Sequence, residues 1–531
     1  MRGAMKKKCS ATLFGWSMKE PEIGGPLTIE VVTRDTYDQW KIHKKKRPLK
    51  GSKRVLVGEE LLKDCASNWQ RNTVSDLEFG DIMPSNIYDK GTLRKCKQEY
   101  KEKILGLSIK VTLTSLIELK HTSLSGTIHT ISADMFFVHY WSQHQLIFYN
   151  TARKNSYSRL CIDATGSIIK KLHRSSMNLL SSHIFLYECV LNNSYCQVPV
   201  TQMVSEKQDT LSIYFWLGQW IRDGALIPHE VVSDYSKAII GAMSRAFCNG
   251  ISLHEYSERC YKILNDTYSN IDLPQCYIRI DISHIIKMVC RWKCLLDKHK
   301  YRLKEFYVRC VRLLIGSETM KEFEYILIDI LTVAMSETEG FFKTKNGIEE
   351  NPSEISRKTL LNKIKGEDCN IVNTYIQLND FNNDTDNYNI FDDDTNINDI
   401  NSSMYNFLQK IEDICAKNAS VTGDRLSPYY IPGIKNNILR IAKEFPMWSN
   451  VMKIYFKSPY ENATSAPVEG DFGELKNRIL MHESKPMKVD RFIVTHINSI
   501  ENSLKIARSN QKLQQDSTKI NQEKSGLYKL F

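Results

Sequence analysis

Three acidic residues that are far apart in the sequence have similar surroundings. Asp163 and Asp234 each end a short run rich in Val, Ile and Leu, and Glu469 follows Pro467 at a position typical of a helix start. Open α/β sheets place their ligands at the carboxyl ends of their strands. A pair of divalent cations needs several carboxylates that converge on one point. As a set, the three acids therefore predict a metal site for phosphoryl transfer, with Mg²⁺ or Mn²⁺ as the cofactor.

Each acid taken alone has a simpler explanation. Asp163 could belong to an ordinary strand-ending turn, because Asp and Gly are favoured in turns. Near Asp234, either Ser233 or Asp234 could cap the next helix by accepting hydrogen bonds from the amides before Ala238. A glutamate in the first turn of a helix, such as Glu469, is usually explained by the helix dipole. The metal-site hypothesis therefore depends on the three acids as a set.

A fourth segment joins an acid at the end of a predicted strand to a histidine at the start of a predicted helix. The acid is Asp281, and His284 follows three positions later. This pair could orient a metal ligand or contact DNA. In the structural alternative, His284 caps the helix and Asp281 pairs with Arg279 or Lys287.

The composition is that of an ordinary globular protein with an excess of positive charge. The chain has 531 residues, of which 42% are hydrophobic and 25% charged, and its formal net charge is +11. Its length predicts two or three domains. The positive charge favours a polyanionic partner, because Lys and Arg release counterions when they bind phosphates. No run approaches the roughly 18 apolar residues of a membrane span, so no membrane partner is expected.

One N-terminal segment concentrates this charge. Residues 41–54 contain eight Lys or Arg, among them Lys44, Lys45, Lys46 and Arg47. A patch of this kind is typical of nuclear import or phosphate binding. It predicts a nuclear protein in which these four residues contact DNA. A solvated basic loop is the alternative.

The pattern of apolar residues predicts an α/β core that is interrupted by a long insertion. Hairpin-linked strands are followed by alternating helices and strands, which matches the ribonuclease-H-like order. In that order the strands that end at Asp163 and Asp234 are neighbours. The predicted strands are 138–142, 145–150, 159–164, 184–191, 198–205, the run before Asp234, and 276–281; the predicted helices are 58–70, 92–105, 210–222, 237–247, 284–296, 321–335, 403–416 and 468–479.

Five regions are expected along the chain. The fold class is α/β, a ribonuclease-H-like core with a large, mostly helical insertion and a helical basic N-terminal region. The insertion includes a tract rich in Asn and Asp that has few apolar residues and is expected to be disordered. The regions are 1–111, basic and mostly helical; 112–296, the first part of the core; 297–460, the insertion, with its Asn/Asp-rich loop near 379–401; 461–507, the final catalytic helix and the C-terminal helical part of the core; and 508–531, a polar tail.

Four segments, in this order along the chain, resemble transposases of Mutator-like DNA elements: CIDATGSIIKK, PHEVVSDYSKAIIGAMSRAF, RIDISHIIKMVCRWK and APVEGDFGELKNRI. The resemblance extends over about residues 95–507. It implies a ribonuclease-H-like core and a DDE transposase that uses Mg²⁺ to cut DNA strands and transfer their ends. It also implies that Asp163, Asp234 and Glu469 are the catalytic acids.

The resemblance also carries differences and further expectations. Family members commonly have a Cys-x-x-His motif where this chain has Asp281 and His284, so only the histidine carries over. They usually have an upstream zinc-binding DNA-recognition domain, whereas only Cys9 precedes Cys65 here, and the N-terminal region is interpreted as a truncated DNA-binding domain. The expected partners are double-stranded DNA, as transposon ends and target, and further copies of the chain in a homo-oligomer on DNA. The alternative function is that of a domesticated or decayed transposase that binds DNA without cutting it.

Overall fold

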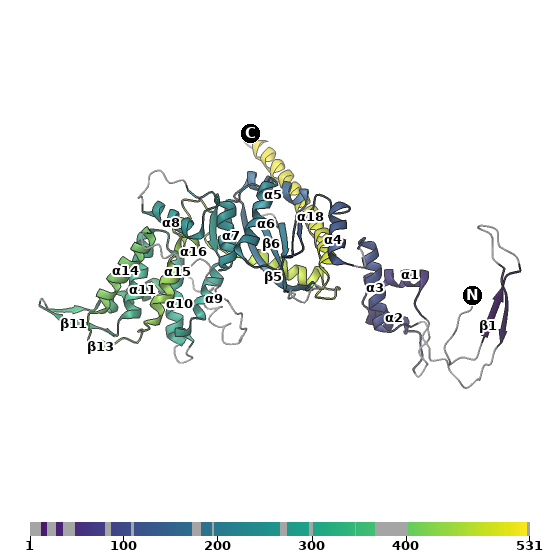
Figure 1. The fold of residues 1–531 in the computed structure, drawn as a ribbon. Helices are drawn as coiled ribbons and strands as arrows, with labels where there is room; N and C mark the ends of the chain where they lie inside the picture. Colours follow the sequence, from purple (N-terminus) through teal and green to yellow (C-terminus); the bar gives the residue numbers. More distant parts are fainter. Residues whose placement is uncertain are drawn as a thin grey trace. The chain divides into compact units, whose positions relative to one another are not determined.

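The computed structural model describes residues 12–18, 28–34, 48–79, 87–107, 111–172, 182–193, 196–265, 273–296, 301–345, 347–366 and 402–527. These residues belong to two compact units, one up to Gly106 and one from Leu107 onwards (Figure 1). The basic residues Lys44, Lys45, Lys46 and Arg47 and the Asn/Asp-rich loop at 379–401 lie outside the described residues. Within those ranges, no helix has the length and apolar character needed to cross a membrane.

The first unit contains a two-stranded hairpin and three helices. The hairpin pairs β1 (Thr12–Trp16) with β2 (Glu30–Arg34) and was not predicted. The predicted helix at 92–105 is confirmed as α3 (Lys90–Ile104). The helix expected over 58–70 is instead two helices, α1 (Gly51–Lys63) and α2 (Ala66–Thr73).

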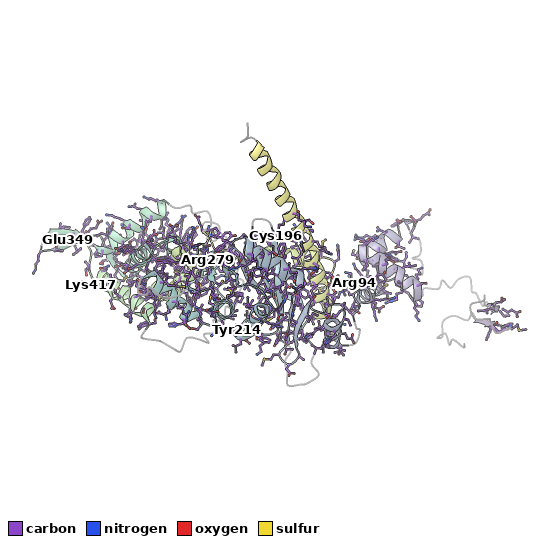
Figure 2. The ribbon with its side chains drawn as sticks, turned by 90° about the horizontal axis from the view of Figure 1, so that it is seen from above. Arg94, Cys196, Tyr214, Arg279, Glu349 and Lys417 are labelled. Carbon is purple, nitrogen blue, oxygen red and sulfur yellow. The ribbon has the colours of Figure 1, made fainter. Side chains whose placement is uncertain are left out.

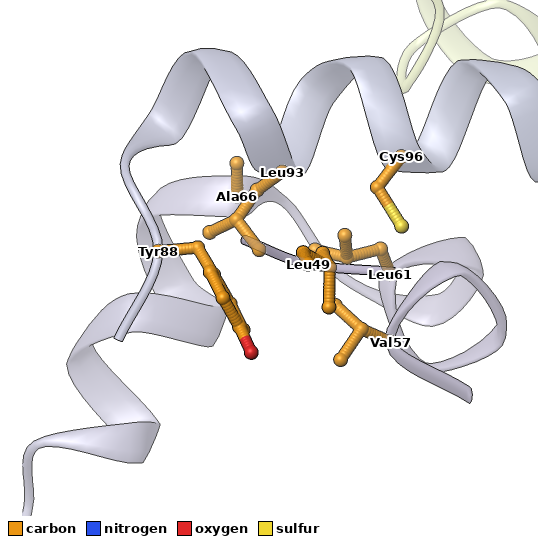
Figure 3. Close-up of a cluster of buried hydrophobic side chains, with 7 residues drawn as sticks. All are labelled: Leu49, Val57, Leu61, Ala66, Tyr88, Leu93 and Cys96. Atoms are coloured by element: carbon orange, nitrogen blue, oxygen red, sulfur yellow. The ribbon is translucent and has the colours of Figure 1, made fainter. Parts of the chain in front are cut away.

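A small apolar core holds the three helices together. Gly58 of α1 lies so close to α3 that an added Cβ would be 2.7 Å from Tyr100 Cβ, so the packing of the two helices requires glycine there. The break between α1 and α2 allows both helices to contribute to one core. Figure 3 shows the side chains that form it: Leu49, Val57, Leu61, Ala66, Tyr88, Leu93 and Cys96.

The second unit is built on a seven-stranded mixed sheet with the order β3-β4-β7-β6-β5-β8-β9. β5 pairs antiparallel with β6 and parallel with β8, and β8 pairs parallel with β9. The prediction that the strands carrying Asp163 and preceding Asp234 are neighbours is confirmed. The strands are β3 (Ile128–Ser132), β4 (Phe137–Tyr140), β5 (Arg159–Ile169), β6 (Ile184–Asn192), β7 (Gln197–Ser205), β8 (Glu230–Ser233) and β9 (Tyr277–Ile280).

Most of the predicted helices of this unit are confirmed. Those expected at 210–222 and 237–247 coincide with α6 and α7, and the one expected at 284–296 begins earlier and ends earlier, as α9. β3 and α8 were not predicted. Outside the insertion, the helices are α4 (Thr112–His121), α5 (Gln143–Asn155), α6 (Thr210–Arg222), α7 (Lys237–Phe247), α8 (Leu253–Leu264), α9 (Ile282–Cys290), α17 (Ala466–Glu474) and α18 (Val489–Leu527).

The strand predicted at 145–150 is wrong, because these residues lie in α5. Ser142 and Gln145 form a capping box, in which each side chain accepts a hydrogen bond from the backbone N–H of the other. Leu146 and Tyr149 are buried three positions apart on one face of the helix. The apolar run is short enough to fit the period of a helix or that of a strand, and the capping box favours the helix.

Helices cover both faces of the sheet. Thr201 and Gln202 are neighbours on β7, so their side chains point to opposite faces. On one face, Trp216 of α6 donates its indole N–H to Thr201 Oγ1 at 3.0 Å. On the other face, Gln145 of α5 donates to Gln202 Oε1 at 3.2 Å. α17 packs across β5, β6 and β7, and α18 packs on β7 and α5.

One buried histidine of the sheet gives the fold a sensitivity to acid. His139 of β4 is 0% exposed, and its Nδ1 lies 2.8 Å from Gln219 Oε1 of α6. Burial lowers the pKa of His139 to about 4. Between that value and the ordinary pKa of about 6.5, the unfolded chain binds a proton that the folded protein excludes. This histidine therefore reduces stability as the pH falls through that window.

We expect the variant His139→Gln to lose part of this acid sensitivity. The wild type should lose about 3 kcal/mol of unfolding free energy from His139 between pH 6.5 and pH 4. Urea unfolding at pH 7.5, 6 and 4.5 measures the difference. His254→Gln, at an exposed histidine, is the matched control. An unchanged pH dependence in His139→Gln would contradict the assignment.

The insertion between α9 and α17 is mostly helical. The predicted helices at 321–335 and 403–416 are confirmed as α11 and α14, and in Figure 1 the insertion helices lie together in green. The short strands of the insertion were not predicted: β10 (Thr338–Glu339), β11 (Phe341–Thr344), β12 (Gly347–Glu350) and β13 (Arg425–Leu426). The helices are α10 (Tyr301–Gly316), α11 (Met320–Met335), α12 (Pro352–Lys365), α14 (Ser403–Ala419), α15 (Gly433–Ala442) and α16 (Phe445–Trp448).

Candidate active site

The register of two parallel strands brings the two aspartates together. Ile162 of β5 pairs with Ser233 of β8. The next residue on each chain is the acid, so Asp163 and Asp234 lie side by side, one position beyond this pair. β8 ends at Ser233, whereas β5 continues to Ile169 because it keeps pairing with β6. The predicted location at a strand end is therefore correct for Asp234 and wrong for Asp163, which lies in the middle of β5.

Local hydrogen bonds hold both carboxylates. Asp163 Oδ1 accepts from the N–H of Ala164 at 2.7 Å. Asp234 Oδ1 accepts from the N–H of Ser236 and from the hydroxyl of Ser233, each at 3.2 Å. The N-cap of α7 is Ser236 and not Asp234. Asp234 is therefore not the N-cap residue, but its carboxylate does accept from an amide before Ala238, as the capping explanation expected, in the turn between β8 and α7.

Glu469 reaches the same region from α17. The segment before this helix contacts β5 and the start of α9. Ala463 O accepts from the N–H of Ile282, just after β9, and Thr464 O lies 3.4 Å from Cys161 Sγ of β5. The side chain of Gln197 on β7 donates to Pro467 O at 2.6 Å. These contacts fix the first turn of α17 against the strands.

Asp281 and His284 connect α17 to the other half of the site. Asp281 Oδ1 caps α9 by accepting from the N–H groups of Ser283 and His284. Its Oδ2 accepts from the N–H of Ser465 and, at 2.7 Å, from the Ser465 hydroxyl. His284 Nε2 lies 3.3 Å from Glu469 Oε1. One buried carboxylate thus joins the end of β9 to the start of α17.

The structural alternative for this pair is wrong about the cap, because Asp281, and not His284, caps α9. Arg279 forms its ion pair with Glu230, at 3.7 Å. A pairing of Asp281 with Lys287 stays a prediction. His284 points at Glu469, so the proposed orienting role remains open for it.

The charges in this region influence one another. Burial, with the neighbouring charges of Asp234 and Glu469, raises the pKa of Asp163 to about 7. Burial also raises the pKa of Asp234, against the effect of His284. The hydrogen bond from His284 lowers the pKa of Glu469. Burial alone would lower the pKa of His284, but Glu469, Asp234 and Asp281 outweigh it and the pKa is raised. The three predicted acids and His284 therefore share one electrostatic environment.

The comparison with known proteins supplies an independent observation. No known family model matches the chain. The chain is 32% identical over 509 residues to the 120.7 kDa protein in the NOF-FB transposable element of Drosophila melanogaster. The chain is a relative of a transposable-element protein. The aligned part covers 95% of this chain and 46% of the fly protein, so the chain spans about half the length of that relative.

Two residues of this chain that are not among the predicted site residues, Lys476 and Ser465, also contact the site. Lys476 follows Glu469 by seven positions, and its ammonium donates to Thr165 Oγ1 on β5, two residues beyond Asp163. Burial lowers the pKa of Lys476, and the charge of Asp163 opposes that effect. Ser465 is the link to Asp281. In the sequence, the helical spacing from Glu469 indicates that Lys476 lies on the same side of the helix. Nothing local in the sequence indicates that Ser465 contacts Asp281.

The segment that leads into α17 is anchored by a buried arginine. Arg279 of β9 is 0% exposed and is labelled in Figure 2. Its guanidinium donates to Tyr460 O at 2.9 Å, to Glu461 O at 3.0 Å and to Asn450 Oδ1 at 2.8 Å. Glu230, its carboxylate neighbour, is also fully buried. This arrangement fixes the path of the chain a few residues before Glu469.

A polar cluster lies beneath α17. His496 Nε2 of α18 is 2.9 Å from Glu188 Oε1 of β6, and the Tyr140 hydroxyl is 2.8 Å from His496 Nδ1. Asp471 of α17 and Glu188 influence each other's pKa. Burial raises the pKa of Glu188 to about 7 and that of Asp471 to about 9. The contacts of His496 join α18 to β4 and β6 near α17.

Proposed function

We propose that the chain is a Mutator-like DDE transposase, or a protein derived from one, that cuts DNA strands and joins the freed ends in DNA transposition. The observation that carries the proposal is the common environment of Asp163, Asp234 and Glu469, which come from two neighbouring strands and a helix. The similarity to a protein of a transposable element supports the same assignment. Phosphoryl transfer depends mostly on positioning and charge stabilisation, so a cluster of held carboxylates is what it requires.

A ribonuclease-H-like core is part of this proposal. β5, β6 and β7 are consecutive antiparallel strands, and β8 and β9 follow on the other side of β5, parallel to it. This strand order supports the proposal, and β4 and β3 extend the sheet beyond β7. The insertion then separates β9 from the helix that carries Glu469.

The donor set favours Mg²⁺ or Mn²⁺ as the cofactor. Asp163, Asp234 and Glu469 offer oxygen ligands only, which suit hard divalent cations. Burial is the main cause of the raised pKa values of the two aspartates, and neighbouring carboxylates add to it; a bound cation would stabilise the charged forms. Over the ranges that the structure describes, no three Asp, Glu, His or Cys side chains are close enough together to hold a metal ion. The proposal for the metal therefore depends on the chemistry of the donors.

Some residues of the site would bind the metal ions, and others position these metal ligands. When bound, the metal ions supply charge neutralisation at the attacking and leaving oxygens of the phosphodiester. Asp163 and Asp234 would hold them from the sheet, and Glu469 would do so from α17. Asp281 positions the start of α17 through Ser465. His284 orients the Glu469 carboxylate.

Lys476 has a separate role in this proposal. Its ammonium lies next to Thr165 and close enough to Asp163 to affect its own pKa. A cation beside the acids suits a phosphate of the DNA backbone, since phosphate contacts position a protein on DNA. We assign Lys476 to binding the strand that is cut.

The partners and the compartment follow from the same function. We assign double-stranded DNA, as transposon ends and target, as the substrate, the nucleus as the compartment, and a homo-oligomer on DNA as the working form. The net charge of +11 supports a polyanionic partner. The contacts expected from Lys44, Lys45, Lys46 and Arg47 remain predictions.

The test is cleavage of supercoiled plasmid DNA by the purified chain in Mg²⁺, in Mn²⁺ and in EDTA. Metal-dependent nicking that EDTA stops is the expected result. DNA binding is measured in parallel at 50 to 200 mM salt. Binding that weakens steeply with salt, without nicking in either metal, would reject the enzyme and favour the non-catalytic DNA-binding protein.

A further inference from the structure

The helical insertion reaches the site through the carboxylate of Glu444. This residue lies between α15 and α16 and is 9% exposed. Its Oε2 accepts a hydrogen bond from the Tyr235 hydroxyl at 2.7 Å, and its Oε1 forms an ion pair with Lys237. These two residues flank Ser236, whose N–H donates to Asp234 Oδ1 at 3.2 Å. One side chain of the insertion therefore holds both sides of the turn that carries Asp234.

The turn depends on contacts from outside. α7 begins at Lys237, and the side chain of its N-cap residue, Ser236, makes no capping hydrogen bond. Lys237 Nζ lies 4.9 Å from the centroid of the Tyr235 ring, so the ammonium contacts both the ring and the carboxylate of Glu444. Such an ammonium-ring contact adds to the ion pair. Glu444, Tyr235 and Lys237 thus form a closed set of three mutual contacts, which we call the latch.

The part of the insertion that carries Glu444 is rigidly packed. Phe445 is 0% exposed, and its ring stacks on Phe323 of α11 with centroids 4.4 Å apart. Trp448 is 1% exposed and donates its indole N–H to Ile441 O at 2.8 Å. A side chain whose backbone belongs to a packed core loses little conformational freedom when it forms a contact. Glu444 can therefore fix the geometry of Tyr235 and Lys237.

The insertion is also docked on the core on either side of the latch. Glu258 of α8 accepts the N–H groups of Ser403 and Met404 at the start of α14. The Tyr277 hydroxyl of β9 donates to Ser449 O at 3.3 Å. The position of Glu444 relative to the sheet is therefore determined by contacts that do not involve the latch.

We propose that Glu444 is a positioning residue that sets the direction of the Asp234 carboxylate, which makes the insertion a working part of the catalytic centre. The inference rests on the proposed function, because that function assigns Asp234 to metal-dependent strand cleavage. Glu444 acts through Tyr235 and Lys237 and has no contact with the phosphodiester. The insertion then has a defined role, which is to brace one catalytic turn from outside the sheet.

The experiment compares three variants of the whole chain. Glu444→Ala removes the latch. Glu444→Gln keeps an oxygen that can accept from Tyr235 but loses the charge that pairs with Lys237. Glu412→Ala is the matched control, because Glu412 pairs with Lys435 at 2.8 Å within the insertion. Two quantities are measured: hydrogen exchange of the peptide that spans residues 234–240, and the single-turnover rate of nicking over a Mg²⁺ titration.

We expect faster exchange in residues 234–240 for Glu444→Ala, by several-fold, and wild-type exchange for Glu412→Ala. The nicking rate of Glu444→Ala should fall about 10- to 100-fold, as is usual when the support of a metal ligand is lost, with a higher Mg²⁺ concentration at half-maximal rate. DNA binding should stay within twofold of the wild type. Glu444→Gln should nick DNA faster than Glu444→Ala, because it keeps the acceptor for Tyr235. A residue that only stabilises the fold would not give this partial recovery of the rate.

The two readouts separate the latch from the proposed function. Unchanged exchange in Glu444→Ala overturns the latch, whether or not the wild type cuts DNA. If hydrogen exchange is faster in Glu444→Ala but this variant is fully active, Glu444 does not position Asp234 for cleavage. If the wild type neither nicks DNA nor responds to Mg²⁺ while exchange still increases in Glu444→Ala, the proposed function fails and the brace on the turn stands as a structural feature only.

Discussion

Replacing Asp163 or Asp234 with asparagine is expected to lower metal-dependent DNA cleavage by about 10³-fold or more. Asparagine keeps the size of the side chain but loses the charge that holds a divalent cation, and such a cation contributes several kcal/mol to the transition state. Gel assays of plasmid nicking in Mg²⁺ measure the loss. DNA binding should stay close to the wild type, since phosphate contacts come from basic residues.

The fold should tolerate both substitutions. Burial and neighbouring charges already raise the pKa of each aspartate, so a neutral side chain relieves repulsion at neutral pH. Thermal unfolding is therefore expected to be unchanged or slightly higher. Glu474→Gln, at an exposed acid on α17, serves as the control that keeps activity. If both asparagine variants still cut DNA, the metal mechanism is wrong.

Replacing Arg279 with leucine is expected to lower the unfolding free energy by about 3–5 kcal/mol. The substitution leaves Glu230 charged and fully buried, and it removes the donors to Tyr460 O and Glu461 O. Removing one partner of a buried pair is costly because the other group loses its counter-ion, although Glu230 keeps its hydrogen bonds from Tyr157 and Ser458. Urea unfolding measures the change.

A second substitution separates the ion pair from the packing around it. The double variant Arg279→Leu with Glu230→Leu should recover a large part of the loss, because two apolar groups can replace a buried pair. Arg279→Lys should fall between the wild type and Arg279→Leu, since an ammonium lacks the planar fork that reaches several acceptors. Wild-type stability in Arg279→Leu alone would show that the anchor before α17 is unimportant.

Local sequence patterns were sufficient for much of the fold. α6, α7, α11 and α14 have strong helical periods, and β5, β6 and β7 have runs of apolar residues long enough to identify a strand. The pattern was insufficient at 145–150, where the same apolar run fits both periods and the capping box of Ser142 decides. It also missed β3 and α8, and it placed Asp163 at a strand end because pairing with β6 beyond that residue is not visible locally.

By itself, the sequence determined which acids are candidates and in what order they occur, because strand ends and helix starts have local signatures in residue type and spacing. Only the tertiary structure decided how these segments meet. The register of β5 with β8 makes Asp163 and Asp234 neighbours, Asp281 reaches Ser465 across 184 positions, and Glu444 reaches Tyr235 across 209. The physical reason is that such contacts depend on how whole helices and strands pack, which short-range propensities do not encode.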